Sequence, residues 1–199
     1  EILFSTSLFS DTDPIIIKIK DFTVCNEQNL IYLLTTTEIY FYFAVNYLKD
    51  QIIDYFGDGR KWKVEIKYLS EEKPLGTAGA LSLLPVKPSE PFLVLNGDVL
   101  TEIDYSEVLK YHHESESDAT LCVYEHNTQI PYGVVRIDKE QVFGIEEKPI
   151  VSHHVNAGIY LLDPKLLNEV PKNHFFDKRR WPLGSLSIRT ATCPVDGSV

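Results

Sequence analysis

Asp98 is the residue of this chain best placed to do chemistry, because it follows a short apolar strand. The stretch Pro91-Phe-Leu-Val-Leu-Asn-Gly-Asp98 is apolar up to Leu95 and polar from Asn96 onward. A buried parallel strand is a continuous apolar run, and ligands of open α/β sheets bind where such strands end. A carboxylate at that point can hold a divalent cation such as Mg²⁺. We therefore predict that Asp98 is a metal ligand and Asn96 a supporting polar group; ordinary turn residues are the alternative for both.

A turn of small residues precedes this strand. The segment Lys73-Pro-Leu-Gly-Thr-Ala-Gly-Ala-Leu81 opens into a helical pattern that Pro85 ends. Its glycines would let a ligand approach the backbone closely. A helix that begins with small residues for tight packing explains such a run equally well.

Two further segments follow the strand. Gly144-Ile-Glu-Glu-Lys-Pro149 carries a lysine, whose ammonium suits a phosphate as a compact point charge. Val155-Asn-Ala-Gly-Ile-Tyr160 places an asparagine at the start of an apolar strand. A solvated charge run and a turn asparagine are the alternative readings. Together the four segments indicate a phosphate-handling site on an α/β sheet.

Strands and helices alternate through most of the chain, which predicts parallel strands joined by right-handed crossovers. We expect a three-layer α/β/α domain with a Rossmann-like, mixed but mostly parallel sheet. One domain over residues 1–177 is predicted, with an atypical start at 1–36 and an atypical tail at 178–199. The predicted strands are 38–45, 63–68, 92–96, 119–124, 133–137, 141–146 and 156–162, and the predicted helices are 48–56, 76–84, 105–114 and 164–170.

Composition narrows the class of protein. The 199 residues are 44% hydrophobic and 24% charged, as in an ordinary globular protein, and the net charge of −10 argues against a nucleic-acid partner. The three cysteines match no disulfide framework or metal spacing, so we expect a reducing, cytoplasmic setting. The sequence contains no run of about 18 apolar residues, so we predict no membrane span. An oligomer is possible, and its size stays open. A chain without methionine is expected to be a fragment, a processed product or an altered reading of a longer gene.

The order of the motifs resembles the nucleotide-sugar pyrophosphorylase family, also called sugar-1-phosphate nucleotidyltransferases. L-G-T-A-G-A-L, F-L-V-L-N-G-D, P-Y-G-V-V, E-E-K-P and V-N-A-G-I-Y follow one another in the family's order, over about residues 37–177. Each motif is weak alone, and five in the right order are specific. The mannose-1-phosphate guanylyltransferase-like branch is the most similar.

This resemblance implies partners and roles. The partners would be a nucleoside triphosphate and a sugar-1-phosphate, with Mg²⁺ as cofactor held by Asp98. Lys148 would bind the sugar phosphate and, with Asp98, serve catalysis. The nucleotide would lie against Gly76, Thr77, Gly79 and Asn96, and the sugar against Gly133, Glu147 and Asn156.

The chain also departs from the family pattern. Residues 1–34 contain no match to the glycine-rich G-x-G-T-R loop or the P-K-P segment, and the tail has no match to the segment that carries a second metal aspartate. We therefore expect a nucleotidyltransferase core that is truncated or impaired as given. The first alternative is a non-catalytic nucleotide- or sugar-phosphate-binding homologue or a gene fragment. The second is a glycosyltransferase with a similar sheet, which would release a nucleoside diphosphate instead of pyrophosphate.

Overall fold

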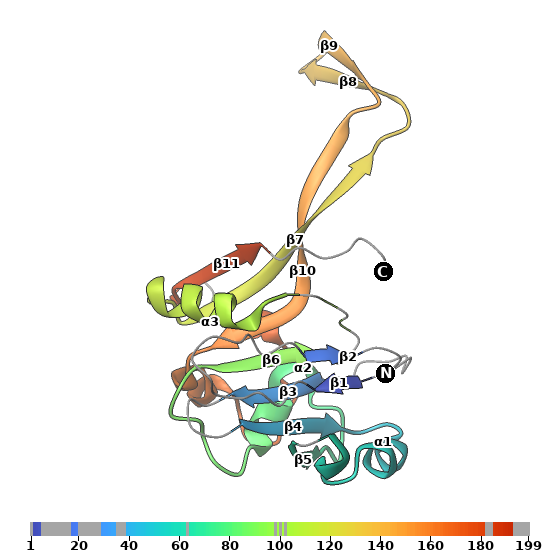
Figure 1. Ribbon diagram of the computed structural model, residues 1–199. Coiled ribbons are helices and arrows are strands. Elements are labelled where there is room, and N and C mark those ends of the chain that lie inside the picture. Colours follow the sequence, from blue (N-terminus) through green and yellow to red (C-terminus); the bar gives the residue numbers. More distant parts are fainter. Residues whose placement is uncertain are drawn as a thin grey trace.

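A computed structural model describes residues 2–4, 17–19, 29–34, 39–62, 64–97, 99, 101, 103–181 and 185–192. Its main sheet has seven strands in the order β11-β7-β10-β6-β3-β4-β5 (Figure 1). These strands are β3 (Asn29–Leu34), β4 (Ile39–Val45), β5 (Glu65–Ser70), β6 (Phe92–Asn96), β7 (Ala119–Gln129), β10 (Ile150–Leu162) and β11 (Ile188–Thr192).

Five of the seven strands run in one direction, and β3 and β10 run against them. The β4–β5 and β7–β11 pairs are parallel. Strand β3 is antiparallel to both β4 and β6, and β10 is antiparallel to both β6 and β7. Strands β4, β5, β6, β7 and β11 therefore share a direction, which confirms the expected mixed, mostly parallel sheet.

The sheet has a hydrophobic core on each face, because neighbouring strand residues point to opposite sides. Leu93 and Leu95 pack in one core with helices α1 (Lys49–Phe56) and α3 (Tyr105–Glu114). Phe92 and Val94 pack in the other, with the short helices α2 (Gly76–Gly79), η2 (Ala80–Leu83) and η3 (Pro164–Glu169). Helices thus cover both faces, and the three-layer α/β/α prediction is confirmed.

The helices begin and end where the sequence predicts. Asp104 caps α3 by accepting the N–H of Ser106 at 2.9 Å, and Asp163 caps η3 by accepting the N–H of Lys165 at 2.8 Å. Gly57 ends α1 with a positive φ of 57°. Among the described residues, no helix is long and apolar enough to cross a membrane.

An arm extends from the main sheet (Figure 1). Strands β7 and β10 continue well past the positions where the sequence predicts their limits, and they pair with each other from Ala119 to Gln129. A separate two-stranded sheet, β8 (Gly133–Asp138) with β9 (Gln141–Glu147), forms the end of this arm. The remaining elements are a short β1–β2 pair (Ile2–Phe4, Ile17–Ile19) and the single turns η1 (Arg60–Trp62) and η4 (Lys178–Arg180).

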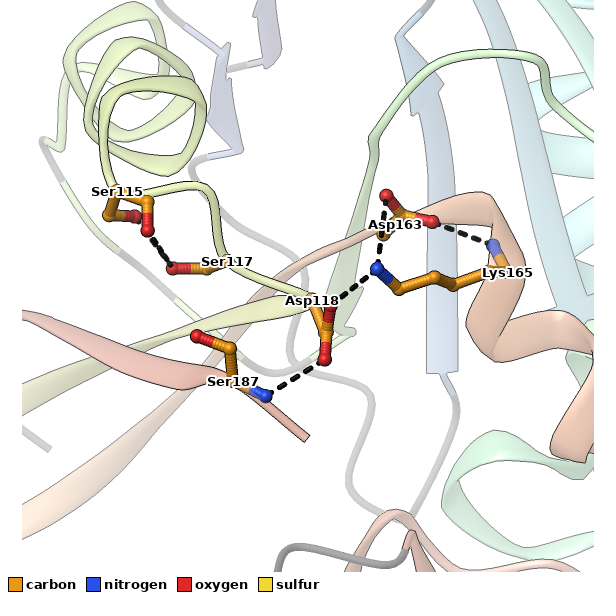
Figure 2. A network of polar contacts seen from close by, with 6 residues as sticks. All are labelled: Ser115, Ser117, Asp118, Asp163, Lys165 and Ser187. Carbon is orange, nitrogen blue, oxygen red and sulfur yellow. Dashed lines mark hydrogen bonds and ion pairs between the residues drawn. The ribbon is translucent and has the colours of Figure 1, made fainter. Parts of the chain in front are cut away.

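A polar network fastens β11 to the sheet (Figure 2). The carboxylate of Asp118 pairs with the ammonium of Lys165 and accepts the backbone N–H of Ser187 at 2.8 Å. Lys165 holds the pKa of Asp118 below its ordinary value, chiefly through this hydrogen bond. Because Asp118 directly precedes β7 and Ser187 directly precedes β11, the network sets the register of their parallel pair.

We expect His112 to make the fold sensitive to acid. It lies on the buried side of α3 with 2% of its surface exposed, and its Nδ1 lies 2.9 Å from Oγ1 of Thr120. Burial lowers its pKa below the ordinary 6.5. The neighbouring His113 and Lys165 also lower this pKa, whereas Asp163 and Asp118 raise it by a smaller amount than burial lowers it. Because the unfolded chain then binds the proton more readily, the free energy of unfolding should fall as the pH drops below about 6.5.

This effect is measurable by urea unfolding between pH 7.5 and pH 5.5. His112→Gln keeps a hydrogen-bonding side chain that does not titrate, so it should flatten the pH dependence in this range. His113→Gln, on the exposed side of the same helix, should leave the dependence in place. An equally steep dependence in His112→Gln would contradict the assignment.

Candidate functional site

Three polar residues lie at one edge of the sheet. Strands β4, β5 and β6 point the same way, and their carboxyl ends lead into Asn46, Glu71 and Asn96. The N–H of Glu71 donates to the carbonyl of Val45 at 3.0 Å, which keeps the ends of β4 and β5 together. This edge is the position at which open α/β sheets bind ligands. Asp98, the predicted metal ligand, lies outside the described residues and comes two positions after Asn96.

The glycine turn lies against the segment His174–Lys178 of the same chain. A Cβ on Gly76, where φ is +80°, would be 2.9 Å from the carbonyl oxygen of Phe176, and one on Gly79 would be 2.8 Å from that of His174. The N–H of Phe176 donates to Leu75 at 2.7 Å, and the N–H of Ala78 donates back to Phe176 at 3.0 Å. Both glycines thus admit the chain's own backbone, and their expected contact with a nucleotide stays a prediction.

Lys178 connects this turn to the polar edge. Its backbone N–H donates to Oγ1 of Thr77 at 2.8 Å, and its ammonium donates to Oδ1 of Asn96 at 2.9 Å. The same ammonium lies 3.9 Å from the ring centroid of Tyr160, a cation–π contact. Lys178 therefore contacts both Thr77 and Asn96, two of the residues predicted for the nucleotide site.

Asn156 belongs to the same cluster. Its Nδ2 donates to the hydroxyl of Tyr160 at 2.5 Å, and its Oδ1 accepts the N–H of Gly158 at 2.9 Å. The pairing of β10 with β7 shifts register between Asn156 and Tyr160, so the strand bends here. Burial raises the pKa of the Tyr160 hydroxyl. Gly158, which Asn156 holds in this bend, lies against the Asn96 amide at the end of β6.

The other predicted sugar-side residues lie on the arm (Figure 1). Gly133 pairs with Glu147 at the base of the β8–β9 hairpin, and a Cβ on Gly133 would be 2.9 Å from Oε2 of Glu147. Lys148 follows with a positive φ of 49°, and its N–H donates to the carbonyl of Tyr132 at 3.2 Å. The structure thus brings Thr77, Asn96 and Asn156 together at the sheet edge. It places the other predicted residues on the arm, namely Gly133, Glu147 and Lys148.

Two residues of the edge were not predicted as functional. Glu71 accepts the N–H of Leu75 at 2.9 Å, and burial raises the pKa of its carboxyl group. Its position just after a predicted strand is a signal that sequence reasoning could have used. Lys178 offers no such signal, because it contacts Asn96 across 82 positions of the sequence.

The described residues contain no ready-made metal centre. No group of three or more His, Cys, Asp and Glu side chains lies close enough among them to hold a metal ion. The amide oxygen of Asn96 is engaged with the ammonium of Lys178. A Mg²⁺ ion at this edge would therefore rest on one or two carboxylates and on ligand phosphates, which is how Mg²⁺ commonly binds with nucleotides. Glu71 is the carboxylate found at the described part of this edge, and the metal role of Asp98 stays a prediction.

Comparison with known proteins identifies the class. The model of the nucleotidyl transferase family matches residues 23–183, and the chain belongs to this family. The fold is the Rossmann-like fold of the nucleotidyltransferases. The expected family resemblance is therefore confirmed.

Named relatives narrow the comparison. The chain is 36% identical over 138 residues to probable mannose-1-phosphate guanylyltransferase 2 of Oryza sativa, covering 64% of this chain and 38% of that protein. Mannose-1-phosphate guanylyltransferase 1 of Arabidopsis thaliana is 35% identical over 136 residues, with the same coverage. The chain thus spans about two fifths of the length of these relatives. Among solved structures, HddC from Yersinia pseudotuberculosis has a TM-score of 0.57 at 25% identity, over 77% of this chain and 69% of that one.

Proposed function

We propose that this domain is the substrate-binding core of a sugar-1-phosphate nucleotidyltransferase of the mannose-1-phosphate guanylyltransferase type. In that reaction a phosphate oxygen of the sugar-1-phosphate attacks the α-phosphorus of a nucleoside triphosphate. The bond to the β-phosphate breaks and pyrophosphate leaves. Such chemistry needs positioning and charge neutralisation instead of a protein nucleophile.

One observation carries the proposal. Thr77, Asn96 and Asn156, taken from three separate motifs, converge around Lys178 and Tyr160 at the carboxyl end of β6. Hydroxyl, amide and ammonium groups are the donors that phosphate oxygens and sugar hydroxyls require. The named relatives that match this chain are guanylyltransferases of mannose-1-phosphate, which supports the choice of base and sugar.

The proposed roles divide between the sheet edge and the arm. Gly76, Thr77, Gly79 and Asn96 would contact the nucleotide, and Asp98 would hold Mg²⁺, which neutralises phosphate charge when it is bound. Asn156 would contact the sugar. Gly133, Glu147 and Lys148 would contact the sugar phosphate from the arm, with the ammonium of Lys148 on the phosphate.

Equilibrium binding tests this function. Calorimetric titration of the 199-residue chain with Mg²⁺–GTP, and separately with mannose-1-phosphate, should show saturable binding of each. A chain that binds ATP and GTP equally would keep the reaction type and lose the guanylyl assignment. A chain that binds no nucleoside triphosphate and no sugar phosphate would rule the proposal out.

A non-catalytic homologue is the second candidate, and the absence of a G-x-G-T-R match from the sequence favours it. Preorganised donors of the kind that such a loop supplies are worth about 10²–10³ each in rate. We therefore expect this chain, with Mg²⁺, GTP and mannose-1-phosphate, to release no more pyrophosphate than a blank. Robust turnover would show that other residues replace that loop, and release of GDP from GDP-mannose would indicate a glycosyltransferase.

A further inference from the structure

Lys178 is a buried cation at the edge of the sheet. Among the lysines and arginines whose side chains the structure describes, it alone is buried, with 8% of its surface exposed. A buried ammonium is costly unless polar groups compensate it. Oδ1 of Asn96 and the face of the Tyr160 ring provide such groups, at 2.9 Å and 3.9 Å. Lys178 is therefore held in one place relative to β6.

This contact decides which way the Asn96 amide faces. A lysine ammonium has hydrogen-bond donors and no acceptor, so Asn96 must turn its oxygen toward Lys178. Its Nδ2 then points the other way, to within 2.9 Å of the place where a Cβ on Gly158 would lie. Nδ2 donates to no residue in the described part of the chain. Asn96 thus presents an N–H donor at the carboxyl end of β6.

The position of Lys178 depends in turn on the glycine turn. Its backbone N–H donates to Thr77, and Phe175 and Phe176, which shortly precede it, lie against Gly76. The turn, the segment His174–Lys178 and the Asn96 amide are therefore linked by direct contacts. A shift of any one of them would change the direction of Nδ2.

We propose that Lys178 is a positioning residue that turns the Asn96 amide so that Nδ2 donates to a phosphate oxygen of the substrate. This inference rests on the proposed function, because it requires a phosphate-bearing ligand at the β6 edge. The phosphate can belong to the nucleoside triphosphate or to the sugar-1-phosphate. Lys178 acts through Asn96, which is the residue that touches the ligand.

Two variants separate this role from a purely structural one. Lys178→Met keeps an aliphatic side chain beside Tyr160 and removes the hydrogen bond that orients the Asn96 amide. Asn96→Asp keeps an acceptor for Lys178 and replaces the donor by a carboxylate oxygen that repels phosphate. Each should weaken binding of Mg²⁺–GTP, of mannose-1-phosphate, or of both by about 10- to 100-fold, as expected for a hydrogen bond to a charged group. Lys178→Arg, which also offers donors only, should restore most of the affinity.

Lys87→Met is the matched control, because Lys87 also donates to an asparagine oxygen, that of Asn168, at 2.7 Å on the exposed surface. It should bind both ligands as the unchanged chain does. Loss confined to one ligand assigns the contact to that ligand's phosphate, and equal loss assigns it to a phosphate position that both occupy.

The outcomes that overturn the inference are distinct from failure of the proposed function. If Lys178→Met melts at a lower temperature but binds both ligands normally, Lys178 is only structural. If Lys178→Met does not fold, Asn96→Asp decides, and normal binding by that folded variant overturns the inference. If the unchanged chain binds neither ligand, the proposed function fails and this inference fails with it.

Discussion

Gly158→Ala should destabilise the protein by about 2–5 kcal/mol. Gly158 has a φ of +75°, where a side chain costs about 1–2 kcal/mol. Its Cβ would also lie 2.8 Å from Cγ2 of Val99 and 2.9 Å from Nδ2 of Asn96. Neighbouring atoms must shift to admit the added methyl group, and such overpacking destabilises a protein by about 1–3 kcal/mol more. Urea unfolding at neutral pH measures the change.

Two other glycines separate these contributions. Gly57 has a φ of +57° and a ψ of −138°, a conformation that essentially only glycine adopts, with nothing within 4 Å of its Cβ position, so Gly57→Ala should show backbone strain without a close contact. Gly144 lies on the exposed hairpin with only Cδ of Arg136 near, at 4.0 Å, so Gly144→Ala should be nearly neutral. If Gly158→Ala is as nearly neutral as Gly144→Ala, the close contact with Asn96 is wrong.

Asp98→Asn should abolish the Mg²⁺-dependent part of nucleotide binding. The change removes the charge that would hold the cation and keeps the shape of the side chain. Affinity for Mg²⁺–GTP should fall by at least about 10- to 100-fold, the range that the loss of even an outer partner of a metal site produces. Calorimetry with and without Mg²⁺ measures it.

Asp104→Asn is the matched control for this variant. Asp104 caps α3 close in sequence, and asparagine caps helices as well as aspartate does. Stability and binding should therefore both stay unchanged. Unaltered Mg²⁺-dependent binding in Asp98→Asn would show that Asp98 is not a metal ligand.

The local elements were predictable because their signals are local. The apolar run of β6 ends at Asn96 as predicted, and α3 has the predicted limits because Asp104 supplies a cap. The predicted strand 38–45 corresponds to β4, and the predicted helix 48–56 corresponds to α1. The motif order also led to the correct family.

The features that depend on distant partners were not predictable. Strands β7 and β10 are long because each supplies the other with hydrogen-bonding partners, although the residues from Glu125 to Gln129 are polar. Strand β11 carries no apolar period in the sequence, and its place beside β7 is set by Asp118 and Ser187. The contact of Lys178 with Asn96 also joins distant parts of the chain, and neither residue type alone predicts the other.

Product competition tests the central claim most directly. GDP-mannose contains both the guanosine nucleotide and the sugar phosphate, so a nucleotidyltransferase site must bind it across both halves. We expect GDP-mannose to displace Mg²⁺–GTP and mannose-1-phosphate, each competitively and with one dissociation constant for GDP-mannose. Displacement of neither ligand, or of one ligand without the other, would contradict a single site formed by the β6 edge and the arm.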